Sequence, residues 1–265
     1  GNYQEAVQYF TKAIELKADY SEAFLSRGNA LYKLGKFEQA VWDYDKAIEL
    51  NGKLIKAYNH RGYCYTEMKD YRRAIEDFTH VIKNMPDYAQ VRVSRGKIYL
   101  QRKKYDLAFQ DFSKAISLDP KSDMALQYRS KTYLAKKDTT AALSDINMAL
   151  QLNPTHPDHL VLRAMINHWK KLDKEAKKDN SAALKSDPNN IDALMQKAKF
   201  IIADGKPSKA CKTLIRVRDA GSRVADELIA EHCEVEDDKE EPEHDKKGSE
   251  AKKRSDKGNK DTANK

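Results

Sequence analysis

The chain has 265 residues, with 49 lysines and arginines against 41 aspartates and glutamates, which gives a formal net charge of +8. Its 10 glycines and 7 prolines are too few for collagen, elastic repeats or a proline-rich linker, and they argue against an all-β chain. No apolar run approaches the roughly 18 residues of a membrane-spanning helix.

The sequence repeats with a period of 34 residues. Alanine recurs at this interval, at Ala6, Ala40, Ala74, Ala108, Ala142, Ala176 and Ala210. A second column in step with it holds a large side chain, at Phe10, Tyr44, Phe78, Phe112, Ile146 and Leu214. A third holds a small residue, at Gly28, Gly62, Gly96, Ser130, Ala164 and Ala198. A period kept without slippage indicates stacked copies of one structural unit rather than one or two globular domains.

Each period is predicted to form two amphipathic helices. In residues 21–54, two helical stripes of apolar residues are separated by Gly35, which is suited to a turn. Asp70 and Asp138 stand where later repeats need a helix N-cap.

The period divides the chain into segments. Residues 1–20 correspond to the second helix of a truncated first repeat, so we expect the chain to be a piece of a longer protein. Six repeats follow, of which the fifth is degenerate, and then a capping helix and a charged tail that we expect to be disordered. The bounds of these later segments are 21–54, 55–88, 89–122, 123–156, 157–190, 191–221, 222–231 and 232–265.

The recurring residues of the second segment identify a family resemblance. The pattern of Phe24, Gly28, Leu31, Gly35, Phe37, Ala40, Tyr44 and Ala47 resembles the tetratricopeptide repeat, and the resemblance covers roughly residues 1–218. It implies an all-α, right-handed α-solenoid of tandem helix-turn-helix repeats, with a concave groove lined by the first helices. Physical reasoning agrees, because one helix pair cannot bury its apolar faces alone and neighbouring pairs must stack.

Two charged columns run in phase along the repeats. Arginine stands at Arg27, Arg61, Arg95, Arg129 and Arg163, and aspartate follows sixteen residues later at Asp43, Asp77, Asp111, Asp145 and Asp179. In the last repeat the arginine becomes Lys197 and the aspartate becomes Thr213, so the two columns change together. We expect each arginine to pair with a carboxylate within or between repeats, because a partly buried charge needs a partner. The alternative of an anion-binding site is disfavoured.

The resemblance also implies that a protein or peptide partner binds in the concave groove. The candidate contacts are Asn29, Tyr32, Asn59, His60, Tyr63, Lys97, Tyr128 and Lys131. Repeats that bind the carboxylate tails of heat-shock chaperones carry a clamp of lysine, asparagine and arginine at set positions. Only Asn29 matches that clamp here, so a chaperone tail is disfavoured as the partner.

Several residues depart from their columns. Trp42 and Trp169 replace mostly polar residues, which makes them candidate interface anchors, with packing on a helix as the alternative. In the degenerate repeat, Asn167 and Asn180 replace large core residues. We expect these two amides to pair with each other, and a soft joint is the alternative.

A basic patch is predicted on the outer, convex side of the second helices near the end of the repeats. It consists of Lys174, Lys178, Lys209, Lys212 and Arg216. An acidic partner, anionic lipid, nucleic acid or the chain's own acidic residues 234–245 would complement it. A solvated helix face is the favoured interpretation, and nucleic acid is disfavoured because few aromatic residues lie among the bases.

The three cysteines, Cys64, Cys211 and Cys233, lie far apart in the sequence and cannot all pair. We therefore expect no disulfide framework, no metal site and a reducing compartment, with the cytoplasm as the location. Basic clusters at 246–247 and 252–254 match a nuclear-import signal, which makes the nucleus the alternative, although a solvated tail is favoured.

No catalytic set, phosphate-binding loop or cofactor motif appears, so we expect no enzymatic activity and no cofactor. The first hypothesis is a protein–protein interaction scaffold that holds a partner segment in its concave groove. One alternative is a co-chaperone or regulatory module of an upstream enzyme domain. The other is a structural component of a large assembly, such as a ciliary complex.

Overall fold

The computed structural model describes residues 2–233, which form fourteen α-helices and no strand. The predicted all-α class is therefore confirmed. The helices are α1 (Tyr3–Leu16), α2 (Ser21–Lys33), α3 (Phe37–Leu50), α4 (Ile55–Glu67), α5 (Tyr71–Asn84), α6 (Ala89–Gln101), α7 (Tyr105–Leu118), α8 (Asp123–Ala135), α9 (Thr139–Leu152), α10 (Pro157–Trp169), α11 (Asp173–Ser186), α12 (Ile191–Ala203), α13 (Pro207–Asp219) and α14 (Arg223–His232).

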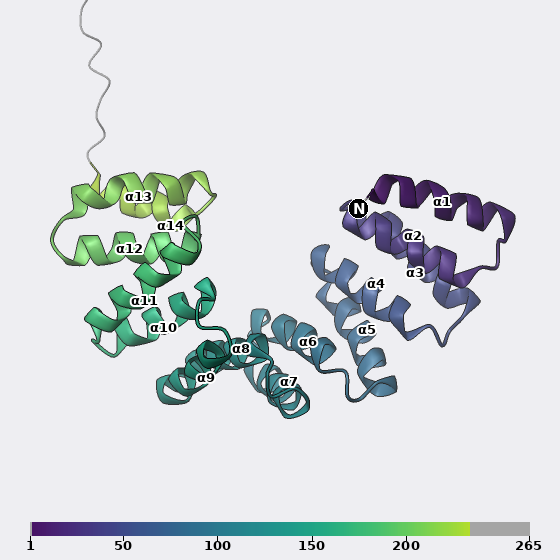
Figure 1. Cartoon of the computed structure of the whole chain (residues 1–265), viewed down its shortest axis with the longest axis horizontal. Coiled ribbons are helices and arrows are strands. Elements are labelled where there is room, and N and C mark those ends of the chain that lie inside the picture. Colours follow the sequence, from purple (N-terminus) through teal and green to yellow (C-terminus); the bar gives the residue numbers. More distant parts are fainter. Residues whose placement is uncertain (1, 234–265) are drawn as a thin grey trace, which may run out of the picture.

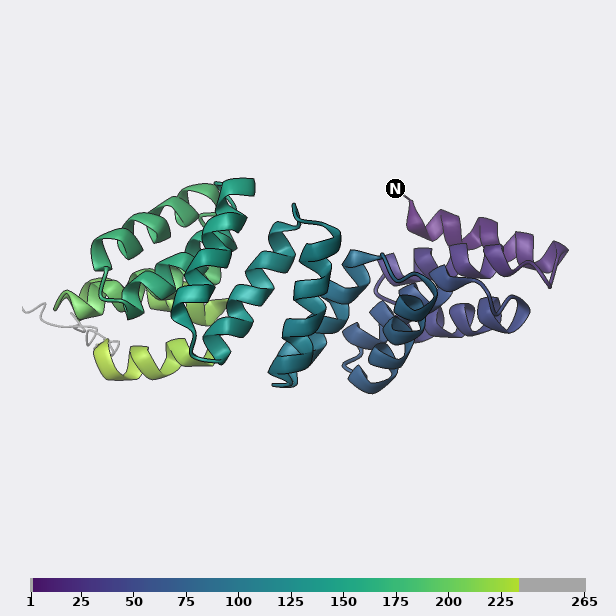
Figure 2. The ribbon, with the colours of Figure 1, turned by 90° about the horizontal axis from the view of Figure 1, so that it is seen from below.

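The helices form a row of hairpins along a curved path. Each even-numbered helix from α2 to α12, here called a first helix, packs against the odd-numbered second helix that follows it. The hairpins follow one another around an arc (Figure 1), and the view from below shows them as an elongated row (Figure 2). Helices α4 and α6 line the inside of the arc, and α5 and α7 lie on its outside (Figure 1). This is the solenoid architecture that the period predicts.

A tight turn joins the two helices of each hairpin. Its middle residue has a φ angle between 56° and 73° in every hairpin, at Gly35, Lys69, Lys103, Lys137, Lys171 and Gly205. Glycine adopts this left-handed conformation freely, whereas lysine does so at a cost of about 1 kcal/mol. The predicted N-caps are present, since the side chains of Asp70 and Asp138 accept hydrogen bonds from the backbone N–H groups of Arg73 and Ala141.

The columns of large and small residues meet inside each hairpin. The second-helix side chains Tyr44, Phe78, Phe112, Ile146 and Leu214 are fully buried. Opposite three of them the first helix carries a glycine, and a Cβ atom on Gly96 would lie 2.7 Å from Cε1 of Phe112. Real Cβ contacts are never this short, so the close approach of the two helices depends on the missing side chain.

The degenerate repeat, α10 and α11, corrects one prediction. Asn167 and Asn180 are buried as expected, but they do not pair with each other. Asn167 Nδ2 donates to Oδ2 of Asp179 at 3.4 Å, and Asn180 Nδ2 donates to the carbonyl oxygen of Ala193 at 3.1 Å. Each amide group therefore donates a hydrogen bond to a different neighbouring acceptor, and the two side chains do not bond to each other.

Helix α14 covers the end of the last repeat. Its side chains Leu228 and Ile229 pack with the buried Leu214 of α13. The predicted start of the tail, residue 232, is too early. His232 is the last residue of α14, and Cys233 forms a disulfide bond. The rest of that predicted tail lies outside the described residues. Among residues 2–233, no helix is both long and apolar enough to cross a membrane.

Candidate functional site

The five arginines of the charged column all bind the aspartates that follow sixteen residues later. In each pair, Nε donates to Oδ2 and a terminal nitrogen donates to Oδ1, over distances of 2.7–2.9 Å. The aspartates are buried, and Asp43 has no exposed surface. The hydrogen bonds that Arg129 donates to Asp145, together with the negative charge of that carboxylate, hold the pKa of Arg129 above its ordinary value, so this guanidinium stays charged. We call these ten residues the Arg–Asp ladder.

The ladder also connects successive hairpins, which the sequence analysis left open. The third guanidinium nitrogen donates to the residue sixteen positions before each arginine, on the preceding second helix. These acceptors are all short polar side chains, at Thr11, Asp45, Thr79, Ser113 and Asn147. Each arginine therefore joins three helices, and each of its three guanidinium nitrogens donates a hydrogen bond within the protein. The ladder is structural.

Four predicted groove residues line a hollow beside α1. The hollow has a volume of about 670 Å³ and is walled by α1, α2 and α4, with Asn29, Tyr32, His60 and Tyr63 in its lining. Burial, followed by the charges of Lys56 and Lys33, lowers the pKa of His60, so this imidazole is neutral near pH 7. The hollow is therefore partly aromatic, and Lys33 is the charged residue of its lining.

Three further groove residues meet on the next pair of first helices. The ammonium groups of Lys97, from α6, and Lys131, from α8, each lie 5.1 Å from the centre of the Tyr128 ring. This distance allows a cation–π interaction with both lysines. Neither ammonium group forms an ion pair with a carboxylate of residues 2–233, so both charges are left to solvent or to a ligand. We call these three residues the lysine–tyrosine site.

The prediction that Asn59 contacts a partner in the groove is wrong. It is buried with 6% of its surface exposed, and its Oδ1 atom has no hydrogen-bond partner among the described residues. Its column also contains Leu25 and Val93, both buried, which shows that this face of the first helix points into the core. The apolar residues at the equivalent positions of other repeats already indicate that this position faces the core.

The structure places the two tryptophans at the surface. Trp42 is 52% exposed and Trp169 is 56% exposed. The Trp42 ring also lies 6.0 Å from the Phe24 ring and 6.0 Å from the guanidinium carbon of Arg27. One part of Trp42 therefore packs on its own hairpin, and the rest is available as an interface anchor for a partner.

The residues of the basic patch are all exposed, on α11 and α13. Four of them, Lys174, Lys178, Lys209 and Lys212, are lysines without an ion pair among the described residues. Arg216 instead donates to Oδ1 of Asn189 at 3.0 Å and to the carbonyl oxygen of Pro188 at 3.3 Å. Arg216 therefore links the turn before α12 to α13. This structural contact was not part of the predicted basic patch.

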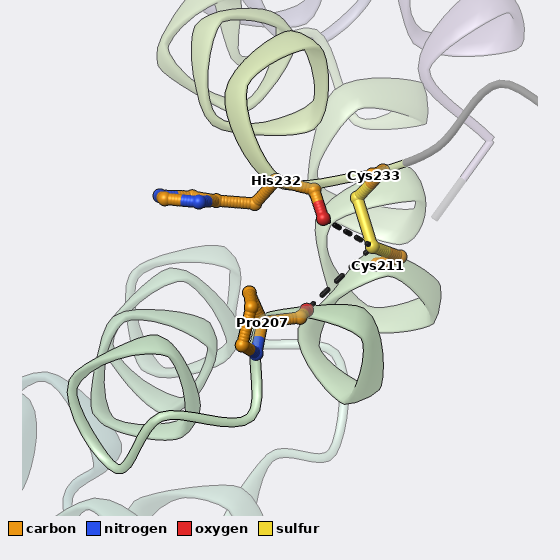
Figure 3. The surroundings of a disulfide bond; sticks show 4 residues. All are labelled: Pro207, Cys211, His232 and Cys233. Atoms are coloured by element: carbon orange, nitrogen blue, oxygen red, sulfur yellow. Dashed lines mark hydrogen bonds between the residues drawn. A yellow bond between two sulfur atoms is a disulfide. The ribbon is translucent and has the colours of Figure 1, made fainter.

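The structure contains one disulfide bond, whereas the sequence had led us to expect no disulfide framework. Cys211, on α13, is bonded to Cys233, which follows α14 directly (Figure 3). The carbonyl oxygens of Pro207 and His232 lie 3.6 and 3.7 Å from Sγ of Cys211 (Figure 3). The two cysteines have a sequence separation of 22, and the return of α14 along α13 brings them together. The cytoplasmic location was inferred from the cysteine pattern and stays a prediction.

Reducing this bond is expected to loosen α14 while leaving the other hairpins folded. Cross-links that close a loop of this size contribute about 3 kcal/mol, mainly by restricting the unfolded chain. Hydrogen exchange of the α14 amides should therefore accelerate when a reductant is added. The double variant Cys211→Ser/Cys233→Ser should exchange fast with or without reductant. Protection of α14 that is identical in all four samples would contradict this prediction.

The chain resembles known families along much of its length. Two models described as the tetratricopeptide repeat match, one at residues 1–20 and the other at residues 55–88 and 89–122. A third, described as the TPR repeat, matches residues 28–69. No curated protein matches the sequence.

Solved structures share the fold at low sequence identity. A tetratricopeptide repeat protein from Parabacteroides merdae has a TM-score of 0.74 at 19% identity, over 87% of this chain and 92% of its own. Cut9–Hcn1 of the APC/C has a TM-score of 0.75 at 14% identity, over 88% of this chain but only 46% of its own. YrrB, a TPR protein with an unusual peptide-binding site, has a TM-score of 0.57 at 22% identity, over 71% of this chain and 97% of its own. Residues 1–20 and 28–122 thus match tetratricopeptide-repeat models, and the helical architecture of the described residues is the one that solved tetratricopeptide repeat proteins have.

Proposed function

We propose that the protein is a non-enzymatic scaffold that binds a segment of a partner protein along the inner side of its first helices. The observation that carries the proposal is the lysine–tyrosine site, in which two unpaired ammonium groups from neighbouring first helices flank one aromatic ring. Two ammonium groups near one ring and without a carboxylate partner attract an anionic group. The site therefore fits an acidic peptide segment.

The fold is compatible with this use. A curved row of hairpins presents a continuous inner surface to an extended or helical segment. YrrB, which shares the fold, is described as having a peptide-binding site. That likeness supports peptide binding as a class of function, and the partner chemistry comes from the residues of this chain.

Charge reversal at the lysine–tyrosine site tests the proposal. A set of acidic 15-residue peptides, each with a matched version in which Gln and Asn replace Glu and Asp, is titrated into the labelled chain at low and at physiological salt. We expect the acidic peptides to bind more tightly than the neutral versions, and the double variant Lys97→Glu/Lys131→Glu to lose at least about tenfold in affinity.

The matched control reverses two exposed lysines outside the site. Lys209→Glu/Lys212→Glu changes the net charge by the same amount on the second helix α13, so it lowers any general attraction between the chain and the peptide equally. Equal losses in the two double variants would mean that peptides bind by net charge alone, and the groove proposal would then fail.

A further inference from the structure

A buried histidine occupies a position of α10 where the other first helices have a small apolar residue. His159 is 1% exposed, and the equivalent residues are all buried, at Ala23, Ala57, Val91, Ala125 and Ala193. In α8 this residue, Ala125, belongs to the same core cluster as Ala115 of α7, the preceding second helix. The position therefore lies at the joint between successive hairpins, and His159 lies at the joint between α9 and α10.

A second imidazole covers the first. The ring of His156, the N-cap residue of α10, stacks on the ring of His159, with 4.0 Å between the ring centres and 16° between the ring planes. Nδ1 of each ring is buried and has no hydrogen-bond partner among residues 2–233. A neutral imidazole has one nitrogen without a hydrogen, whereas in a charged imidazole both nitrogens carry an N–H donor. This buried pair is therefore suited to the neutral state.

The groups around His159 disfavour a positive charge on its ring. Burial lowers the pKa of His159 to about 4, and the nearby His156 and Lys131 act in the same direction. The carboxylates of Asp123, on α8, and Asp158, on α10, act in the opposite direction. Each of them accepts a hydrogen bond from an asparagine side chain, over 3.3 Å from Asn153 and 3.0 Å from Asn190.

The other helices packed on α10 contribute apolar side chains to its surroundings. The core cluster that contains the next two residues of α10 also holds Leu150 of α9, Ala183 of α11 and Ala193 of α12. Among the described residues, the groups that act on the charge of His159 therefore come from α8, from α10 and from its N-cap residue.

We propose that this histidine pair makes the joint between α9 and α10 an acid-operated hinge, which is closed at neutral pH and opens as the pH falls. A protonated His159 carries a charge and an additional N–H donor in a buried place where its Nδ1 has no acceptor. Opening gives the ring access to water, so acid favours the open joint. Because α9 and α10 belong to neighbouring hairpins, opening changes the angle between the two parts of the row.

The two states of the joint define the pH range of the hinge. In the open state His159 titrates near its ordinary pKa of 6.5, and in the closed state near 4. Above pH 6.5 the ring is neutral in both states and adds nothing to opening. Between pH 6.5 and 4 the open state binds the proton first, so the equilibrium constant for opening rises as the pH falls. At pH 5 we expect it to be at least about tenfold larger than at pH 7.5.

Hydrogen exchange on the full chain tests the inference without any partner. Exchange is followed by mass spectrometry at pH 7.5 and at pH 5, and each rate is divided by the intrinsic rate of an unstructured peptide at the same pH. We expect the protection of α10 to fall about tenfold at pH 5 relative to that of α4 and α5 in the same sample. His159→Ala and His159→Val restore residues found at this position in other repeats and should keep the protection of α10 within about twofold between the two pH values.

The matched control removes a stacked histidine that lies elsewhere. His80, on α5, stacks on the ring of Tyr58 with 4.0 Å between the ring centres. His80→Ala should leave the acid response of α10 as it is in the unmodified chain. Equal protection of α10 at the two pH values, a loss of protection spread evenly over all helices, or an acid response that both His159 variants retain would each overturn the inference.

Discussion

Replacing Asp111 with alanine is expected to destabilise the protein by about 3–5 kcal/mol, because it leaves the Arg95 guanidinium partly buried without its carboxylate. Asp111 is 3% exposed and accepts two hydrogen bonds from Arg95 at 2.8 Å. The free energy of unfolding is measured by urea titration followed by circular dichroism. The effect is large because removal of one partner leaves the desolvation cost of the other.

Two comparisons separate this cost from other effects. The double variant Arg95→Met/Asp111→Leu removes both charges and should recover much of the loss, because the buried charge itself is then absent. Glu76→Ala breaks the exposed pair with Arg72 within α5 and should cost about 0.5 kcal/mol or less. If Asp111→Ala were as mild as Glu76→Ala, the ladder would contribute little to stability.

Replacing Gly96 with alanine is expected to destabilise the protein by about 1–2 kcal/mol, although the same change normally stabilises a helix. The helix-propensity gain of about 0.5–1 kcal/mol is opposed by overpacking of about 1–3 kcal/mol, since the new Cβ atom would lie 2.7 Å from the Phe112 ring. Thermal unfolding and urea titration both measure the change.

A size swap provides the internal test of this second prediction. In the background Phe112→Leu, the substitution Gly96→Ala should become neutral or stabilising, because Ala198 and Leu214 already coexist in the last hairpin. The control Gly52→Ala lies in a loop where the Cβ atom meets only the Ile48 carbonyl at 3.8 Å, so it should change stability little. Additive effects of Gly96→Ala and Phe112→Leu would refute the proposed steric coupling.

The regular columns of the sequence predicted the fold and the pairing of the ladder. The joint change of the two columns, to Lys197 and Thr213, indicates from the sequence alone that they are in contact. The third partner of each arginine was equally visible as a column of short polar residues sixteen positions earlier. It was missed because threonine, serine, aspartate and asparagine share hydrogen-bonding capacity rather than charge.

The sequence-based predictions were wrong where the result depends on the direction of a side chain or on the path of the chain after a helix. Asn59 is polar, and its residue type suggested the groove, but its place on the helix directs it into the core. Cys211 and Cys233 are separated by a helix, and their contact depends on the angle at which α14 returns over α13. Neither spacing nor composition encodes that angle, since it is set by packing of the capping helix.

The ladder has a consequence for how the molecule comes apart. Each arginine attaches its hairpin to the one before it, so opening one hairpin weakens its neighbour, and unfolding spreads in sequence along the row. The chain of attachments stops after Arg163, because Lys197 replaces the next arginine. Beyond that point other contacts take over, because Asn180 of α11 donates to the carbonyl oxygen of Ala193 in α12, and Lys177 pairs with Asp204. The covalent bond between Cys211 and Cys233 then ties the end of α14 to α13, so the last part of the row is held by a cross-link instead of the ladder.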